Sequence, residues 1–238
     1  MQILENRGDE FLAAARGIDI LDAQQKARSR RAGRERGERM AQMQKAGWTG
    51  GETRDYHGGK IMIVRAARPQ DAHAVARVRT ISWQATYRGT VPDSYLDALT
   101  PAESEERWRA LAAGEMPGNE LLVCEVDGAV VGFAAYGAAR PPAFGYSGEL
   151  FATYYLPEAM GKGYGTATVA KVVAGLKRLG HADMILWVME ANARGRRFYD
   201  GIGGTPIEGA RQSFEIEGTP IWEIAYGFRP LPDLSAKR

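Results

Sequence analysis

The sequence predicts a mixed α/β fold with about seven strands, and three observations support that prediction. From residue 62 onward, apolar runs of strand length alternate with stretches whose apolar residues recur at helical spacing. Asp127-Gly128 and Glu217-Gly218 each separate two such runs, as the turns of β-hairpins do. A glycine-rich turn at residues 161–165 joins a strand directly to a helix.

The same pattern places each element between residues 62 and 228. Strands are runs of apolar, aromatic or β-branched residues, helices have one apolar side, and Pro or Gly residues separate them. In chain order we expect a strand at 62–66, helices at 71–87 and from 93 or 101 to 113, strands at 121–126, 130–136 and 150–156, a helix at 163–179, a strand at 184–188, a helix at 192–202, and strands at 206–216 and 220–228.

The helices are assigned from their apolar sides. Residues 88–92 contain Gly and Pro and therefore end the first helix, but the start of the second stays open between Asp93 and Pro101. The apolar sides are Ala72, Val75, Ala76, Val78 and Trp83 in the first helix, Leu96, Leu99, Trp108 and Leu111 in the second, and Val169, Val172, Val173, Leu176 and Leu179 in the helix after the glycine turn.

The glycine turn predicts an anion site. Gly161, Gly163 and Gly165 precede or open a helix, whose first backbone N–H groups have no partner within the helix and attract anions. No Gly-Lys-Ser/Thr run occurs, so the turn is not a Walker loop. Thr166 stands where a dinucleotide-binding fingerprint needs a small third residue, so that motif fails as well.

The run Met160-Gly-Lys-Gly163-Tyr-Gly165 resembles the pyrophosphate loop of the GNAT superfamily (GCN5-related N-acetyltransferases), Gln/Arg-x-x-Gly-x-Gly/Ala, with Met160 in the first position. The order of elements over residues 62–229 is similar to the GNAT fold, a curved mixed sheet with helices on both faces. Residues 82–92 are similar to a stretch of many uncharacterised bacterial members. The resemblance implies an enzyme that transfers an acetyl group from acetyl-CoA to a primary amine by direct attack, without a metal.

The resemblance also implies how acetyl-CoA is bound. In this family the strand before the glycine loop separates from its neighbour and binds the pantetheine arm through its backbone, while the loop binds the pyrophosphate. Asn192 begins a run, Asn192 to Tyr199, that resembles the signature Asn-x-x-Ala-x-x-Phe/Leu-Tyr with Gly195 in place of Ala. The implied contacts are Thr153, Tyr154, Tyr155 and Asn192 for pantetheine, and Gly161, Lys162, Gly163, Tyr164, Gly165 and Thr166 for the phosphates.

Glu149 and Tyr199 are the candidates for proton transfer. Glu149 precedes Met160 by eleven residues, the spacing of the catalytic glutamate in several GNAT histone acetyltransferases. Its apolar neighbours in sequence would raise its pKa and favour a general base, whereas a solvent-facing carboxylate at a strand end is the alternative. Tyr199 would protonate the leaving thiolate; the alternative is a tyrosine of the core.

The acceptor amine is not identified by the sequence. In GNAT enzymes the first two helices and the C-terminal hairpin bind it, which makes Trp83 and Tyr87 candidate substrate-binding residues. Aromatic residues also serve as ordinary core residues. A small molecule and the N-terminus of a peptide or protein both remain open as acceptors. A non-catalytic CoA-binding module with this fold is the first alternative function.

Residues 1–60 are predicted to be a basic extension, partly helical or disordered, followed by the GNAT domain at 61–229 and a tail at 230–238. The extension holds 12 Lys/Arg and 9 Asp/Glu, and residues 48–60 read as a linker. A nucleic-acid-associated protein is therefore a second alternative, although the rest of the chain is nearly neutral and carries no nucleic-acid-binding motif. Whether residues 1–61 belong to the natural mature protein stays open.

Composition bounds the remaining possibilities. The 238 residues carry a net charge of +2 and 45% hydrophobic residues, which is ordinary for a globular enzyme. Cys124 is the only cysteine, so no disulfide can form within the chain, and no run is long and apolar enough to span a bilayer. We expect a cytoplasmic enzyme without membrane or nucleic-acid partners, and a homodimer remains open.

Overall fold

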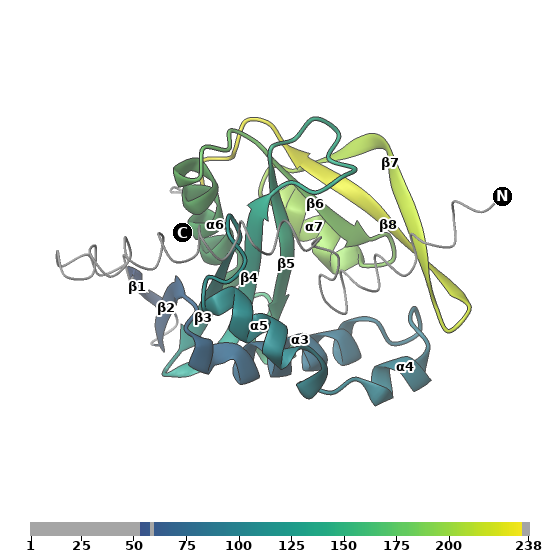
Figure 1. The fold of residues 1–238 in the computed structure, drawn as a ribbon, viewed down its shortest axis with the longest axis horizontal. Helices are drawn as coiled ribbons and strands as arrows, with labels where there is room; N and C mark the ends of the chain where they lie inside the picture. Colours follow the sequence, from purple (N-terminus) through teal and green to yellow (C-terminus); the bar gives the residue numbers. More distant parts are fainter. Residues whose placement is uncertain (1–52, 58–59, 235–238) are drawn as a thin grey trace.

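The computed structural model describes residues 53–57 and 60–234, whose strands form one mixed sheet in the order β1-β2-β3-β4-β5-β6-β8-β7 (Figure 1). Neighbouring strands are antiparallel except β5 and β6. The elements are β1 Thr53–His57, β2 Lys60–Ala66, η1 Pro69–Asp71, α3 Ala72–Thr86, α4 Asp93–Ala98, α5 Ala102–Ala112, β3 Glu120–Val126, β4 Ala129–Ala138, β5 Gly148–Tyr155, η2 Pro157–Ala159, α6 Tyr164–Arg178, β6 Met184–Met189, α7 Ala193–Gly201, β7 Thr205–Ile216 and β8 Thr219–Phe228.

The predicted mixed α/β fold is confirmed, and each predicted strand and helix lies within a few residues of its expected bounds. The sequence left the start of the second helix open between Asp93 and Pro101, and the structure has a helix at each place: α4 begins at Asp93 and α5 begins directly after Pro101. Leu99 is extended (φ −62°, ψ 128°) and ends α4. Thr100 precedes Pro101, a position that disfavours helical backbone, so α5 begins only after the proline.

One strand was not expected. Residues 53–57, which lie in the predicted linker, form β1 and pair with β2 from Thr53↔Val64 to His57↔Lys60. The polar composition of this stretch is typical of a linker, but backbone pairing with an exposed edge strand does not depend on an apolar side chain. Lys60, the last residue of the predicted extension, begins β2, and residues 1–52 and 58–59 lie outside the described residues.

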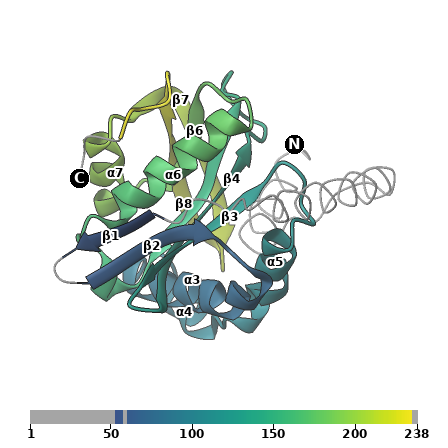
Figure 2. The same cartoon turned by 90° about the vertical axis from the view of Figure 1, so that its left-hand side faces the viewer.

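Helices cover both faces of the sheet. Figures 1 and 2 show α3, α4 and α5 on one face and α6 and α7 on the other. On the first face Trp108 of α5 meets Phe133 of β4 with ring centres 5.0 Å apart. On the second, the Tyr155 hydroxyl of β5 donates to Thr168 Oγ1 of α6 at 2.5 Å. The central strands of the sheet therefore lie between two helical layers, whereas β7 at the edge is largely exposed.

Three further findings concern general features of the chain. Cys124 is fully buried in the core. Within residues 53–57 and 60–234, no helix combines the length and apolar character needed to cross a membrane. The same residues contain no group of three or more His, Cys, Asp or Glu side chains placed to bind a metal ion.

The feature that positions the site is the separation of β5 from β6. These parallel strands pair at Gly148↔Met184 and Glu149↔Ile185, after which β5 continues to Tyr155 without a paired residue on β6. A register shift against β4 leaves Phe151 as an extra residue, and a bulge of this kind bends its strand. The divergence opens the sheet and leaves the backbone of residues 150–155 available on the side of β6.

Candidate active site

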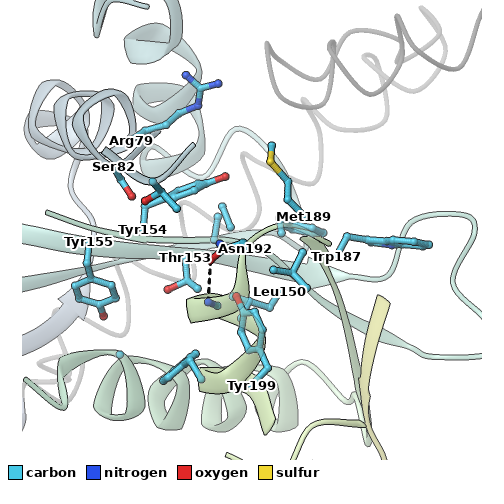
Figure 3. A pocket seen from close by; sticks show the side chains of 18 of the residues that line it. Arg79, Ser82, Leu150, Thr153, Tyr154, Tyr155, Trp187, Met189, Asn192 and Tyr199 are labelled. Carbon is cyan, nitrogen blue, oxygen red and sulfur yellow. Dashed lines mark hydrogen bonds between the residues drawn. The ribbon is translucent and has the colours of Figure 1, made fainter. Parts of the chain in front are cut away.

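A cavity of about 520 Å³ lies where β5 and β6 separate. Its lining comes from both faces of the sheet, so the cavity passes through the sheet rather than lying on one side of it. Figure 3 shows Tyr199 and Thr153 on the side of α7, with Tyr154, Arg79 and Ser82 on the side of α3. The lining also includes Trp83, Tyr87, Arg107, Arg140, Glu149, Gly161, Gly163, Gly165, Thr166, Asn192, Arg194, Arg197 and Glu223.

The glycine turn borders the cavity at the N-terminus of α6. Gly161 (φ 76°) and Gly163 (φ 81°) adopt the left-handed backbone that favours glycine, and Gly163 is the N-cap of the helix. Gly165 lies so close to α7 that an added Cβ would be 3.2 Å from the Phe198 ring. The first N–H groups of α6 therefore meet the cavity with little side-chain cover, as an anion site requires.

The side chains of two residues in the predicted phosphate loop lie outside the cavity lining. The side chain of Lys162 is exposed and does not line the cavity. Tyr164 is 4% exposed in the core, and its carbonyl oxygen accepts a hydrogen bond from the Tyr155 hydroxyl at 3.2 Å. Because a helix turns its successive side chains to different sides, only some residues of a contiguous motif can face one cavity.

Positive charge beside the glycine turn comes from α7. Arg194 and Arg197 line the cavity, and Arg194 Nη1 approaches Met160 Sδ at 3.1 Å. Met160 occupies the loop position where Gln or Arg is usual, so Arg194 supplies a cation next to that position from another helix. Sequence reasoning missed both arginines, although the basic run 194–197 directly after the Asn192 cap was the available signal.

The three predicted residues of β5 face different surroundings. Thr153 Oγ1 is buried and has no hydrogen-bond partner among residues 53–57 and 60–234. Tyr155 points into the core, where its hydroxyl lies within hydrogen-bond distance of Thr168 Oγ1 and of the Tyr164 carbonyl oxygen. Tyr154 lies on the α3 side and packs on Phe133, with ring centres 5.6 Å apart. Thr153 therefore has an unused polar side-chain atom, whereas the Tyr155 side chain is structural.

Asn192 joins the two sides of the cavity. Its Oδ1 accepts the backbone N–H of Gly195 at 2.8 Å, which makes it the N-cap of α7. Its Nδ2 donates to the Tyr87 hydroxyl at 3.4 Å. Tyr87 and Trp83 both line the cavity, with ring centres 5.0 Å apart, so the two predicted substrate-binding residues lie together on the α3 side.

Tyr199 lies in the cavity wall on α7, with its ring centre 5.8 Å from that of Tyr226. Burial raises the pKa of its hydroxyl above the ordinary value, and the nearby Tyr154 adds to that effect. The hydroxyl is consequently protonated at neutral pH. A protonated hydroxyl in a cavity wall is a group that can donate a proton.

Glu149 is not in the apolar surroundings that the sequence analysis expected, nor does it face solvent. It is 2% exposed and forms an ion pair with Arg140, which follows β4. Its Oε2 accepts the Arg140 backbone N–H at 2.9 Å and Nε at 3.2 Å, while Oε1 accepts Nη2 at 2.5 Å. Both carboxylate oxygens are therefore engaged by Arg140.

Glu223 is a second cavity carboxylate, and sequence reasoning missed it. It lies on β8 opposite Met189, is 6% exposed, and accepts a hydrogen bond from Gln212 Nε2 at 3.4 Å. Burial raises its pKa to about 8; the Gln212 hydrogen bond and the Arg140 charge oppose that rise, and the Glu149 charge adds to it. The sequence does contain a pattern that could have indicated its burial. Residues alternate along β8, and Glu223 falls on the same buried face as Ile221 and Ala225.

Comparisons with known proteins agree with this geometry. The family model described as the acetyltransferase (GNAT) family matches residues 76–203. The chain is 34% identical over 176 residues to the uncharacterized N-acetyltransferase YuaI of Bacillus subtilis (strain 168), covering 74% of this chain and 96% of YuaI. Two solved structures are similar in fold. The PaiA N-acetyltransferase of Thermoplasma acidophilum in complex with coenzyme A has a TM-score of 0.58 and 19% identity, and the match covers 71% of this chain and 98% of that chain. YncA of Salmonella typhimurium with its cofactor acetyl-CoA has a TM-score of 0.55 and 20% identity, and the match covers 71% of this chain and 93% of that chain.

Proposed function

The chain belongs to the GNAT acetyltransferase family, and from that premise we propose that it binds acetyl-CoA in this cavity and transfers the acetyl group directly to an amine. The observation that carries the proposal is the separation of β5 from β6 beside the N-terminus of α6. A free strand edge, the N-terminus of α6 and the side chain of Tyr199 border this one cavity, which supports the proposal.

The residues present fit acetyl-CoA. Residues 161–166 would bind the pyrophosphate through backbone N–H groups, with charge from Arg194 and Arg197. The buried Thr153 Oγ1, which lacks a partner within the described chain, would bond the pantetheine arm, as would Asn192. When bound, acetyl-CoA supplies the thioester. The coenzyme A and acetyl-CoA complexes of similar folds support this assignment.

Two side chains would move protons. The acceptor would enter as an ammonium, and Glu223 would take one of its protons so that the nitrogen becomes a nucleophile. The Tyr199 hydroxyl would give its proton to the leaving thiolate and would regain one from the acylated nitrogen, which must lose a second proton to become a neutral amide. Glu149 would keep Arg140 in place, and it remains a second candidate for the base.

Acetyl-CoA is expected to raise the melting temperature of the full chain, because a ligand that binds only the folded state stabilises it. At a concentration about 100 times the dissociation constant, the gain is about 2.7 kcal/mol. Differential scanning fluorimetry measures the shift, with adenosine as a control that lacks the phosphates and pantetheine. A panel of amines then tests for CoA release. Equal melting temperatures with and without saturating acetyl-CoA would rule out the proposed donor.

Gly163→Val is expected to abolish the acetyl-CoA shift, because a β-branched side chain at φ 81° distorts the loop and covers its N–H groups. Gly180→Val is the matched control. Gly180 has φ 90°, faces open space beyond α6 and does not line the cavity, so this substitution strains the backbone without touching the loop. Both variants should melt earlier, and only Gly180→Val should keep the shift. If Gly163→Val kept the full rise in melting temperature with acetyl-CoA, the phosphates would have to bind outside this loop.

A further inference from the structure

Glu223 has one polar neighbour on its own face of the sheet. In the register of β6, β8 and β7 it lies between Met189 on one side and Gln212 on the other. Along β8 its neighbours on the same face are Ile221 and Ala225. Met189, Ile221 and Ala225 are buried and apolar. Among these four neighbours, a hydrogen bond to the Glu223 carboxyl group can therefore come only from Gln212.

Gln212 makes that hydrogen bond from outside the cavity. Its Nε2 donates to Glu223 Oε2 at 3.4 Å, and its half-buried side chain does not line the cavity. An irregularity at residues 207–210 of β7 precedes this pair and sets the register that places Gln212 opposite Glu223. A slip by one residue would turn the Gln212 side chain to the other face of the sheet. Gln212 therefore acts through Glu223 rather than on a molecule in the cavity.

The titratable groups that face Glu223 come from three other elements. Burial favours the neutral form of Glu223, the charge of Arg140 after β4 opposes that effect, and the charge of Glu149 on β5 adds to it. Arg140 and Glu149 form an ion pair, so their charges act on Glu223 in opposite directions. Burial raises the pKa of the Tyr154 hydroxyl on β5 and of the Tyr87 hydroxyl after α3, so both stay uncharged at neutral pH.

We propose that Gln212 is the positioning residue of Glu223: its side-chain amide holds the carboxyl group in place, favours its ionised form, and so sets the pH range in which the base can act. The proposal rests on the proposed function, because it concerns the base of that reaction. A carboxylate accepts a hydrogen bond about twice as strongly as a neutral acid does, and the bond shortens as the charge forms. Gln212 therefore stabilises the form of Glu223 that can take a proton from the acceptor.

Gln212→Met tests this contact in the full chain without acetyl-CoA. Methionine is of similar length but has no N–H donor, so Glu223 should ionise at higher pH than in the wild type. A pH titration by NMR with isotope-labelled glutamate follows the carboxyl carbon of Glu223, whose resonance is identified by its absence in Glu223→Gln. Gln212→Lys should shift the titration to lower pH, because an ammonium favours the carboxylate more than an amide does. Should one variant fail to fold, the other decides by the sign of its shift, and titration at the wild-type pH would overturn the proposal.

Gln84→Met is the matched control. Gln84 is also half-buried and its Nε2 also donates a hydrogen bond, but to the Leu96 carbonyl oxygen at 2.9 Å. The substitution removes the same chemical group without touching Glu223, so the Glu223 resonance should titrate as in the wild type. Equal shifts in Gln84→Met and Gln212→Met would show that a general loss of packing moves the titration, and would overturn the proposal.

The pH profile of CoA release extends the test to catalysis. With a single acceptor, the ratio of kcat/KM between Gln212→Met and the wild type cancels the ionisation of the acceptor itself. We expect kcat/KM of the variant to be roughly three- to tenfold lower at pH 7, part of the value of a hydrogen bond to a charged group. The ratio should return to one at a pH where Glu223 is ionised in both proteins. A loss of the same size at every pH would indicate a purely structural role for Gln212 and overturn the proposal.

The two measurements separate this proposal from the proposed function. If the Glu223 resonance shifts in Gln212→Met while the kcat/KM ratio stays at one at every pH, Gln212 favours the ionised form as proposed, but Glu223 is not the base. If no amine releases CoA, the proposed transfer is overturned, and the titration by itself still decides whether Gln212 favours the ionised form of Glu223.

Discussion

Glu223→Gln is expected to lower turnover by roughly 10²–10⁴-fold, the usual contribution of a general base. The amide keeps the shape of the side chain and its position opposite Met189, but it cannot accept the ammonium proton. Initial rates of CoA release with an identified acceptor measure the effect. Glu149→Gln is the matched comparison, because it alters the other cavity carboxylate, which is held by Arg140.

The proposed role of Glu223 also predicts the direction in which activity and stability change with pH. A base must be deprotonated to act, so kcat/KM of the wild type should rise as pH passes through about 8, the pKa of Glu223, and this rise should be missing in Glu223→Gln. The folded state holds the Glu223 proton up to about pH 8, whereas the unfolded chain releases it near the ordinary value of 4.5. Wild-type stability should therefore fall between these pH values, and less so in the variant. Full turnover and an unchanged pH profile of kcat/KM in Glu223→Gln would show that Glu223 is not the base and would leave Glu149 or water in that role.

Tyr199→Phe is the second variant with a large expected effect. The ring stays beside Tyr226 and only the hydroxyl is lost, so turnover should fall by roughly 10²–10⁴-fold with little change in acetyl-CoA affinity. The loss should be greatest at high pH, where other proton donors are scarce. Single-turnover rates and the acetyl-CoA melting shift separate catalysis from binding.

Tyr226→Phe provides the control for Tyr199→Phe. It removes another buried tyrosine hydroxyl next to α7, and Tyr226 does not line the cavity. Comparable activity losses in the two variants would show that altered packing, rather than a missing proton donor, explains the result. Near-normal turnover in Tyr199→Phe would show that the thiolate takes its proton from another source.

The strands and helices could be predicted because each is encoded by local spacing. Period two and period 3.6 are properties of a few consecutive residues, and the Asp127-Gly128 turn has positive φ at both positions, as the hairpin signal requires. The cap at Asn192 and the glycine turn are local for the same reason. The β1 strand was missed because its pairing with β2 is made by the backbone, which polar side chains do not reveal.

The partners of the cavity residues could not be predicted, because they depend on register and on loops that return to the sheet. Arg140 reaches Glu149 only because β4 and β5 pair at Gly137↔Glu149. Glu223 reaches the cavity through its register with Met189, which the alternation along β8 could suggest but not locate. The side-chain directions of Lys162 and Tyr164 likewise follow from how α6 packs on the sheet.

The gap between β5 and β6 opens toward both helical layers, and this has a consequence for the order of events in turnover. Donor and acceptor can occupy the cavity at the same time, each approaching from its own side of the sheet, so neither has to depart before the other enters. Their products can also leave in opposite directions. Under the proposed function, this geometry predicts a ternary complex with steady-state kinetics of the sequential type, and an acceptor longer than the cavity could keep its remaining length outside, on the side of α3 and α5.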